Sequence, residues 1–327
     1  MASEVTKKIV YLFGAGATHA EVQNLYPDLI NEKRGLLIGN VSSRVIDKAR
    51  KDPKYVKDLD MVSGVAGSLN IELLISLIEN SKIHNWASKT SRLKNWVEDD
   101  IKTILTKSLT ERFFLHKGLF EFHKHEKTGT KEEVIGLISL NYDDVLDQAY
   151  KTVVAKDINY CFSLSTNLPS SQNIPLLKLH GSFNWKNKYV LRKRRTIEII
   201  PLGSSKSYLH APYGFIWNRA LDTLARCDAL RVIGCSLSQN DVHLIDLLFK
   251  AHLELSKPFD IEIIDRELPG QRIKENYGFF PGIKKLSELM SGPDPLNPFR
   301  TWLKYVSTEM LGESDLRATR YLRKVKS

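Results

Sequence analysis

The chain has few cysteines, and their placement excludes two kinds of small-protein scaffold. Only three occur in 327 residues, Cys161, Cys227 and Cys235, and each lies inside an apolar stretch. No two of them form a Cys-x-x-Cys pair, so they cannot supply the ligands of a structural zinc ribbon. The same scatter argues against a disulfide framework. We interpret all three as small side chains of a hydrophobic core.

Long apolar runs are also missing. No stretch is long enough to span a bilayer, and the N-terminus lacks the apolar segment of a signal peptide, so we expect no membrane association and a cytoplasmic location. No Walker motif occurs, which assigns any ATP-driven work to another chain. With 42% hydrophobic and 26% charged residues, the composition is that of an ordinary globular protein with one large core or two smaller ones.

Positive charge is in excess. The chain carries 48 Lys and Arg against 38 Asp and Glu, a formal net charge of +10. This excess suits a partner that bears negative charge, such as a nucleotide, a nucleic acid or an acidic protein. Part of it lies in two blocks, at residues 192–195 and 317–326. Because no recognised nucleic-acid motif accompanies them, we interpret these blocks as solvated faces and expect nucleic acid only indirectly or through such patches.

One short stretch organises the expected fold. Residues 134–140 are mostly apolar and are bounded by polar residues, which predicts a buried strand. Asn141, Asp143 and Asp144 follow, and an apolar stripe at helical spacing begins at Val145. In an open α/β sheet, ligands bind beyond the carboxyl ends of the strands, so these polar side chains could hold a substrate hydroxyl or a water. The alternative is that they only cap the following helix.

Residues 36–130 differ from the rest of the chain because they show helical patterns alone. Their first helix is expected to be capped by Ser42 or Ser43. Apolar positions at spacings of three and four over residues 90–125 predict one long helix or a helix pair, with any break near Gly118. We expect this all-helical insertion to form a roof over the first glycine turn of the chain.

From residue 134 onward, strand and helix patterns alternate, which implies a mostly parallel sheet covered by helices on both faces. The predicted fold class is therefore α/β, a Rossmann-like sheet with an all-helical insertion. Residues 1–35 and 131–290 would form the core, residues 36–130 the insertion, and residues 291–327 a C-terminal helical tail.

Four expected strands end in unusual residues. The first runs into a Gly-x-Gly turn, whose backbone can approach a pyrophosphate. The four ends are Gly14-Ala15-Gly16-Ala17-Thr18, Asn141 to Asp144, His180-Gly181-Ser182, and Gly234 to Ser238. Parallel strands would bring all four to one edge of the sheet, where a nucleotide would bind. The third glycine of the usual fingerprint is replaced by His19.

Together these motifs resemble the sirtuin-like family, particularly its bacterial NAD-consuming branch found in antiphage defence. The resemblance spans roughly residues 8–265 and is carried by residues 13–18, 139–144, 177–182 and 232–241. It implies a Rossmann-like fold that binds NAD between the sheet and a smaller helical module.

Two departures from the family favour NAD cleavage over protein deacylation. Deacylating sirtuins carry a four-cysteine zinc ribbon, which this chain cannot build. Their first motif also continues into a Ser-Gly-Ile-Pro loop, where this chain has Thr18-His19-Ala20-Glu21.

The resemblance implies a role for each motif. Asn141 would contact the ribose or position water, and His180 would be the catalytic base. Asp143 or Asp144 would orient the site or accept a ribose hydroxyl. Asp265, after a late strand, would bind the adenosine half, with a helix cap as the equal alternative. The remaining contacts with NAD would come from Gly14, Ala15, Gly16, Thr18, Asp144, Gly234 and Ser236.

The expected function is that of an NAD glycohydrolase, which cleaves NAD to nicotinamide and ADP-ribose as the effector subunit of a bacterial antiphage system. NAD would be the substrate, and no metal is expected, because His116, His123 and His125 lack cysteines or carboxylates at ligand spacing. The resemblance also implies a homo-oligomer, or assembly with a HerA-type translocase ATPase or an Argonaute-like protein. One alternative is an NAD- or ADP-ribose-binding scaffold or sensor. A sirtuin-type protein deacylase is the less favoured alternative.

Overall fold

A computed structural model gives the fold of this chain. It describes residues 6–25, 35–63, 71–81, 86–109, 114–125, 132–163, 174–185, 189–190, 195–196, 211–237, 241–253, 259–265, 276–278, 280, 283–285 and 297–309. Among the helices in these ranges, none is both long and apolar enough to cross a membrane.

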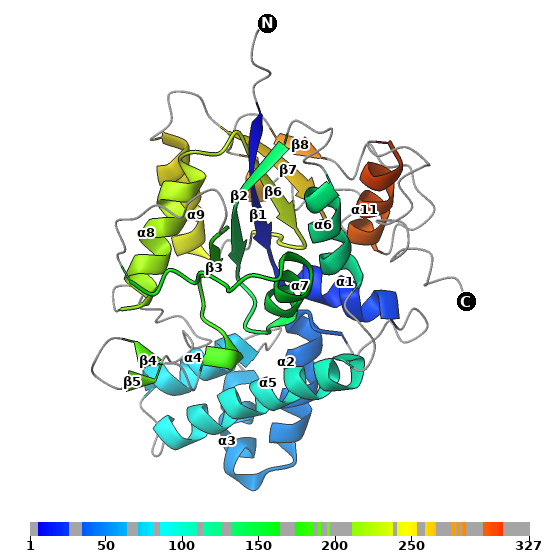
Figure 1. Ribbon diagram of the computed structural model, residues 1–327. Coiled ribbons are helices and arrows are strands. Elements are labelled where there is room, and N and C mark those ends of the chain that lie inside the picture. Colours follow the sequence, from blue (N-terminus) through cyan, green and yellow to red (C-terminus); the bar gives the residue numbers. More distant parts are fainter. Residues whose placement is uncertain are drawn as a thin grey trace, which may run out of the picture.

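A six-stranded parallel sheet lies at the centre of the molecule, in the order β3-β2-β1-β6-β7-β8 (Figure 1). Its strands are β1 (Lys7–Phe13), β2 (Glu132–Ser139), β3 (Leu176–Lys178), β6 (Ala229–Ile233), β7 (Asp260–Ile264) and β8 (Ile283–Lys285). The chain starts at β1, builds outward through β2 and β3, and then returns to the other side of β1. This is the strand order of a Rossmann fold, and its switch point lies between β1 and β6. The predicted fold class is confirmed.

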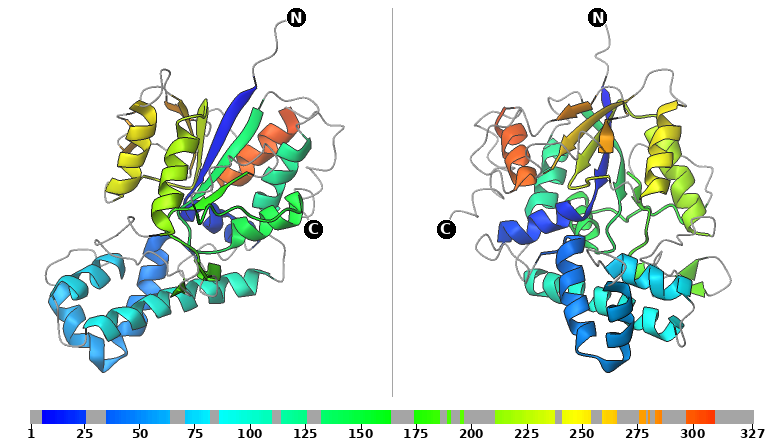
Figure 2. Two further views of the ribbon diagram at one scale, coloured as in Figure 1. Left: turned by 60° about the vertical axis from the view of Figure 1, so that its left-hand side comes forward. Right: turned by 180° about the vertical axis from the view of Figure 1, so that it is seen from behind.

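Strand β1 is central because its sequence is apolar without alternation. Residues 9–13 are all 0% exposed, as expected where helices cover both faces of a parallel sheet. Helices α8 (Tyr213–Leu224) and α9 (Val242–Leu253) lie on one face of the sheet (Figure 2). The other face carries α1 (Ala15–Leu25), α6 (Phe114–His125), α7 (Val145–Val154) and α11 (Pro298–Glu309).

Four helices form a separate module with its own hydrophobic core. They are α2 (Ile38–Arg50), α3 (Pro53–Ser63), α4 (Ile71–Ser81) and α5 (Trp86–Leu109). The module lies beyond the carboxyl ends of the sheet strands (Figures 1 and 2). A small cluster that includes Val22, Ile104 and Val145 joins it to α1 and α7. Figure 1 also labels a short hairpin, β4 (Tyr189–Val190) and β5 (Arg195–Thr196).

Two local predictions in this region are wrong. Helix α2 begins before Ser42 and Ser43, with Leu37 at its N-cap position. Ser42 is buried inside the helix, and its Oγ accepts the amide of Ile71 at 3.0 Å, so it binds the start of α4 instead. The expected break near Gly118 is also misplaced, because Gly118 lies inside α6, which begins at Phe114, whereas α5 ends at Leu109.

Gly118 has a packing reason rather than a helix-breaking one. A Cβ built on it would lie 2.7 Å from Cδ2 of Leu303, so the missing side chain lets α11 approach α6 closely. Leu119 of α6 and Trp302 of α11 are buried in the main core. Both helices thus pack with the sheet, although they come from the stretches expected to form the insertion and the tail. Residues 310–327 of the expected tail lie outside the described residues.

Candidate functional site

The turn after β1 packs directly against the end of β6. The amide of Gly14 donates to the carbonyl of Ile233 at 3.0 Å, and the amide of Gly16 donates to the carbonyl of Gly234 at 2.9 Å. A Cβ on Gly14 would lie 2.4 Å from the Gly234 oxygen, and a Cβ on Gly16 would lie 2.7 Å from the Gly234 Cα. Glycine is therefore required at both positions by close approach of the two backbones.

This contact changes the predicted pyrophosphate cradle. The amides of Gly14 and Gly16 are already bound within the protein, and the amide of Ala17 donates to the Gly14 carbonyl at 3.0 Å. A phosphate beside the turn would therefore depend on the positive end of α1 and on the amides that these contacts do not use. Thr18, in the first turn of α1, is only 2% exposed and points its hydroxyl toward the end of β2.

Asn141 joins the ends of β1 and β2. Its Nδ2 donates to the carbonyl of Gly14 and to Oγ1 of Thr18, both at 2.9 Å. A carbonyl oxygen only accepts hydrogen bonds, so the atom that faces Gly14 must be the amide nitrogen. Both Nδ2 hydrogens are then engaged, and the Oδ1 atom is the part of this side chain suited to accept a ligand hydroxyl or a water.

Asp143 connects α1 and α7 at this edge of the sheet through its two carboxylate oxygens. Its Oδ2 accepts the hydroxyl of Thr18 at 3.0 Å, and its Oδ1 accepts the amide of Val145 at 3.1 Å. It thus caps the start of α7 and also fixes the partner of Asn141. Burial raises the pKa of Asp143 above its ordinary value, although the charge of Lys178 and the two hydrogen bonds oppose this effect.

His180 follows β3 and is held by the neighbouring strand. Its Nδ1 lies 3.2 Å from the carbonyl oxygen of Leu140, which requires Nδ1 to carry the proton. In the neutral ring Nε2 is then the basic atom. The imidazole is 8% exposed and lies 6.1 Å, centroid to centroid, from the ring of Tyr142. Gly181, with φ at 85°, turns the chain directly after it.

The structure connects the predicted residues of β1, β2, β3 and β6 through these contacts. Asp144 is half-buried at the N-cap position of α7, where its side chain makes no capping hydrogen bond. Ser236 is exposed, and its carbonyl accepts Nδ2 of Asn276 at 2.7 Å. Asp265 is half-buried directly after β7. These three residues lie at the same edge of the sheet, without a direct contact to Asn141 among the described interactions.

One residue of this corner was missed by the sequence interpretation. Lys178 is the last residue of β3, is 0% exposed, and binds both loops that carry Asn141 and His180. The only signal for it in the sequence was a lysine between apolar neighbours, Leu177 and Leu179, in an otherwise buried strand. A buried lysine almost always has a charged partner, so a lysine in a buried strand predicts a carboxylate beside it.

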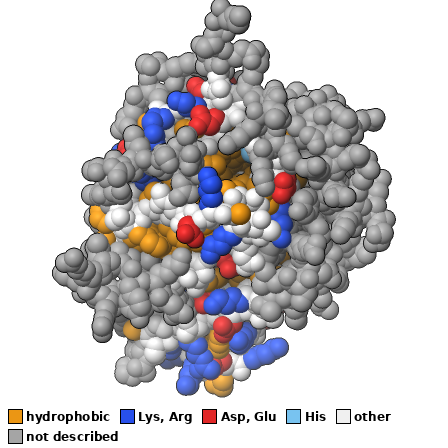
Figure 3. Space-filling model, in the orientation of Figure 1, with side chains coloured by type: hydrophobic (Ala, Val, Ile, Leu, Met, Phe, Trp, Pro, Cys, Tyr) orange, Lys and Arg blue, Asp and Glu red, His pale blue; other side chains and the backbone are white. Residues whose placement is uncertain are grey.

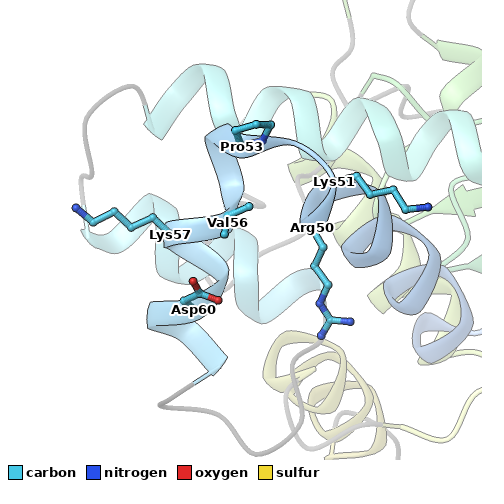
Figure 4. A pocket seen from close by; sticks show the side chains of 6 residues that line it. All are labelled: Arg50, Lys51, Pro53, Val56, Lys57 and Asp60. Carbon is cyan, nitrogen blue, oxygen red and sulfur yellow. The ribbon is translucent and has the colours of Figure 1, made fainter.

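A hollow of about 500 Å³ lies elsewhere, at the turn between α2 and α3 (Figure 4). Its walls are Arg50, Lys51, Pro53, Val56, Lys57 and Asp60. Figure 3 shows Lys and Arg side chains gathered at this lower end of the molecule, with Asp and Glu among them. None of the predicted site residues lines this hollow. The candidate site is therefore the set of strand ends and not the hollow.

No group of three or more histidine, cysteine or carboxylate side chains within the described ranges is placed to hold a metal ion. His116 is buried: it is 1% exposed, and its Nδ1 lies 2.8 Å from Oε1 of Glu21. Nε2 of His123 lies 2.7 Å from the hydroxyl of Tyr11.

One protein-family model matches the central part of the chain. Residues 136–257 match the SIR2-like domain. The match runs from β2 to beyond α9 and contains Asn141, His180 and Gly234. It supports a sirtuin-like assignment for this segment. Comparison with curated protein sequences gives no match.

Solved structures with a similar arrangement include Sir2 proteins. A Sir2 enzyme described for its mechanism and regulation is 14% identical, with 94% of this chain and 98% of that chain covered and a TM-score of 0.41. Sir2Tm bound to a propionylated peptide is 11% identical over 94% of each chain, with a TM-score of 0.42. A Sir2 complex with a p53 peptide and NAD+ is 11% identical over 92% of each chain, with a TM-score of 0.39.

Proposed function

We propose that this SIR2-like chain is an NAD glycohydrolase that cleaves the nicotinamide–ribose bond of NAD. One observation carries the proposal: Asn141 and His180 are held on adjacent strand ends, beside the glycine turn at the start of α1. Carboxyl ends of parallel strands at a Rossmann switch point are where dinucleotides bind. The NAD would lie between this edge of the sheet and the helical module beyond it.

The reaction needs few protein groups. Nicotinamide is attached as a cationic pyridinium and leaves neutral, taking the electron pair of the bond to ribose C1′, so no general acid is required. Water then forms the new bond to C1′ and loses a proton. Nε2 of His180 would take that proton, because Nδ1–H is held by Leu140. Oδ1 of Asn141 would accept the water or a ribose hydroxyl and hold it in place.

Isotope labelling tests the reaction class. NAD is supplied to the purified chain in H₂¹⁸O without any acylated peptide, and the products are separated and weighed by mass spectrometry. Hydrolysis predicts nicotinamide together with ADP-ribose that carries one ¹⁸O at C1′. A cyclic ADP-ribose product without ¹⁸O would show that the reaction is cyclisation and not hydrolysis. Nicotinamide that forms only when an acyl-lysine peptide is added would establish a deacylase instead.

We also propose the setting in which this activity operates, as the effector of a bacterial antiphage system that depletes NAD. This part rests on the family resemblance, which also suggests a homo-oligomer or a complex with a HerA-type ATPase or an Argonaute-like protein. The test is to express the system in bacteria and to follow NAD during phage infection. A fall in NAD that His180→Gln abolishes would support the role, whereas protection without loss of NAD would favour a binding scaffold.

A further inference from the structure

Lys178 occupies an unusual position for a lysine. It ends β3, pairs in register with Ser139 at the end of β2, and has no solvent exposure. Its Nζ donates to the backbone carbonyl of Asp143, to Oδ2 of Asp147 at 3.0 Å, and to Oγ of Ser182 at 2.7 Å. An ammonium group has three hydrogens, so these contacts use all of them.

The three acceptors belong to three different segments. Asp143 lies in the loop after β2, Asp147 in the first turn of α7, and Ser182 in the turn after β3. The hydroxyl of Ser182 continues the connection by donating to the carbonyl of Tyr142 at 3.1 Å. The amide of Phe183 donates to the same carbonyl at 2.9 Å. The loop that carries Asn141 is thereby tied to the turn that carries His180.

Asp147 supplies the counter-charge and is satisfied on its other side. It is 2% exposed, and its Oδ1 accepts the hydroxyl of Tyr160 at 2.5 Å and Nδ2 of Asn184 at 3.3 Å. Burial, together with the negative charge of Asp147, raises the pKa of Tyr160 well above its usual range. Tyr160 therefore stays protonated and keeps donating to the carboxylate.

Stability alone is a poor explanation for this pair. Removing two charges from water costs free energy that their attraction often does not repay, and apolar residues of similar volume are frequently as stable or more so. An apolar pair could fill the same space, but it could not make hydrogen bonds of defined direction. The ammonium fixes one carbonyl, one carboxylate and one hydroxyl in a single geometry. These acceptors belong to the segments that follow β2 and β3, which carry Asn141 and His180.

We infer that Lys178 is a positioning residue, which together with Asp147 holds the Asn141 loop and the His180 turn in their working arrangement. The inference rests on the proposed function for its activity readout only. It assigns Lys178 no contact with NAD, since the side chain is enclosed by protein. Loss of the residue should therefore disturb the geometry of the site rather than remove a reacting group.

The test uses two variants of the full chain. Lys178→Met leaves the Asp147 carboxylate buried without its cation and should destabilise the fold. The double variant Lys178→Met with Asp147→Asn removes both charges at nearly constant volume and should regain most of the lost stability. A matched control is Lys89→Met with Asp58→Asn. Those residues form a largely buried pair at 2.5 Å in the helical module, away from the strand ends.

Two readouts are followed in each variant: nicotinamide release, and the NMR signals of the His180 ring, assigned with His180→Gln. The double variant should fold, lose about 10- to 100-fold in kcat with little change in KM, and show shifted His180 signals. The control should keep native activity and native His180 signals. A folded double variant with native kcat and native His180 signals would overturn the inference.

The two readouts separate this inference from the proposed function. A native chain that binds NAD without releasing nicotinamide would contradict the glycohydrolase. The His180 signals would still decide whether Lys178 positions the turn. Conversely, full turnover together with native His180 signals in the double variant would reject Lys178 as a positioning residue and leave the glycohydrolase standing.

Discussion

Nδ2 of Asn141 donates to the carbonyl of Gly14 at 2.9 Å, which joins two strand ends that are 127 residues apart in the chain. The same nitrogen binds Thr18, the first-turn hydroxyl of α1. A side-chain amide that donates both hydrogens to the protein presents its oxygen, and only its oxygen, to a ligand. Asn141 is therefore better suited to accept a hydrogen bond from ribose or water than to donate one.

Replacing Asn141 by Asp tests this orientation. The change is nearly isosteric, but it places an acceptor oxygen against the Gly14 carbonyl and a negative charge beside it. We expect nicotinamide release to fall by about 100-fold or more, because a small displacement in this corner misplaces the water. Asn95→Asp makes the same chemical change at an exposed position of α5 and should leave turnover unchanged. Equal activity in both variants would contradict the assigned orientation.

Gly16→Ala tests the contact between the glycine turn and β6. The added Cβ would lie 2.7 Å from Cα of Gly234, so one of the two backbones must move. We expect NAD binding, measured by calorimetry, to weaken by at least about tenfold, since the positive start of α1 would shift from the phosphates. The control is Gly39→Ala, within α2, where the new Cβ meets nothing within 4 Å.

The control variant carries its own expectation. Alanine is favoured over glycine in a helix by up to about 1 kcal/mol, so Gly39→Ala should unfold at a slightly higher urea concentration and bind NAD normally. Unaltered NAD binding in Gly16→Ala would show that the turn can accept a side chain. The steric role assigned to this glycine would then be incorrect.

Acid stability should depend on Glu132, at the start of β2. Its carboxylate is 15% exposed and accepts Nη1 and Nη2 of Arg231 at 3.1 and 2.9 Å. Burial alone would raise the pKa of Glu132, but the hydrogen bonds and charge of Arg231 outweigh it and hold the pKa below its ordinary value. The folded state therefore binds the proton less readily than the unfolded chain does. The resulting stability is present above the unfolded pKa and is lost as pH falls through the folded value.

Glu132→Gln should accordingly lower the free energy of unfolding by about 1–3 kcal/mol at neutral pH. The difference from the native chain should shrink as pH falls below about 4, where the native carboxylate also begins to protonate. Urea denaturation of both proteins at neutral pH and below pH about 4 measures the free energy of unfolding and its dependence on pH. Glu133→Gln, at the exposed neighbouring position, should show no such pH-dependent difference. A constant difference at all pH values would exclude this carboxylate as the cause.

The sheet could be predicted from the sequence because its central strands are almost entirely apolar, with Arg231 in β6 as an exception. Residues 9–13 and 229–233 are buried throughout, and they lead into two of the four expected strand ends, at Gly14 and Gly234. The last strand, β8 at Ile283–Lys285, was missed because three residues give no readable period. Gly118 was misread as a break, because a glycine that breaks a helix and one that admits a neighbouring helix look the same in a sequence.

The site could be predicted only in part, for a related reason. Strand ends at one edge follow from parallel topology, so Asn141, His180 and the glycine turn were found together. Their mutual contacts depend on distances across the sheet, which residue spacing does not encode. Lys178 escaped notice because its partners Asp147 and Ser182 become neighbours only after α7 and β3 have packed.

The most direct measurement is nicotinamide release from NAD by the purified native chain beside its His180→Gln variant, with NAD binding followed in the same samples. The account predicts release by the native chain, and a fall of about 10²- to 10⁴-fold in a variant that still folds and still binds NAD. Native chain that binds NAD without releasing nicotinamide, or a His180→Gln variant with full turnover, would contradict it.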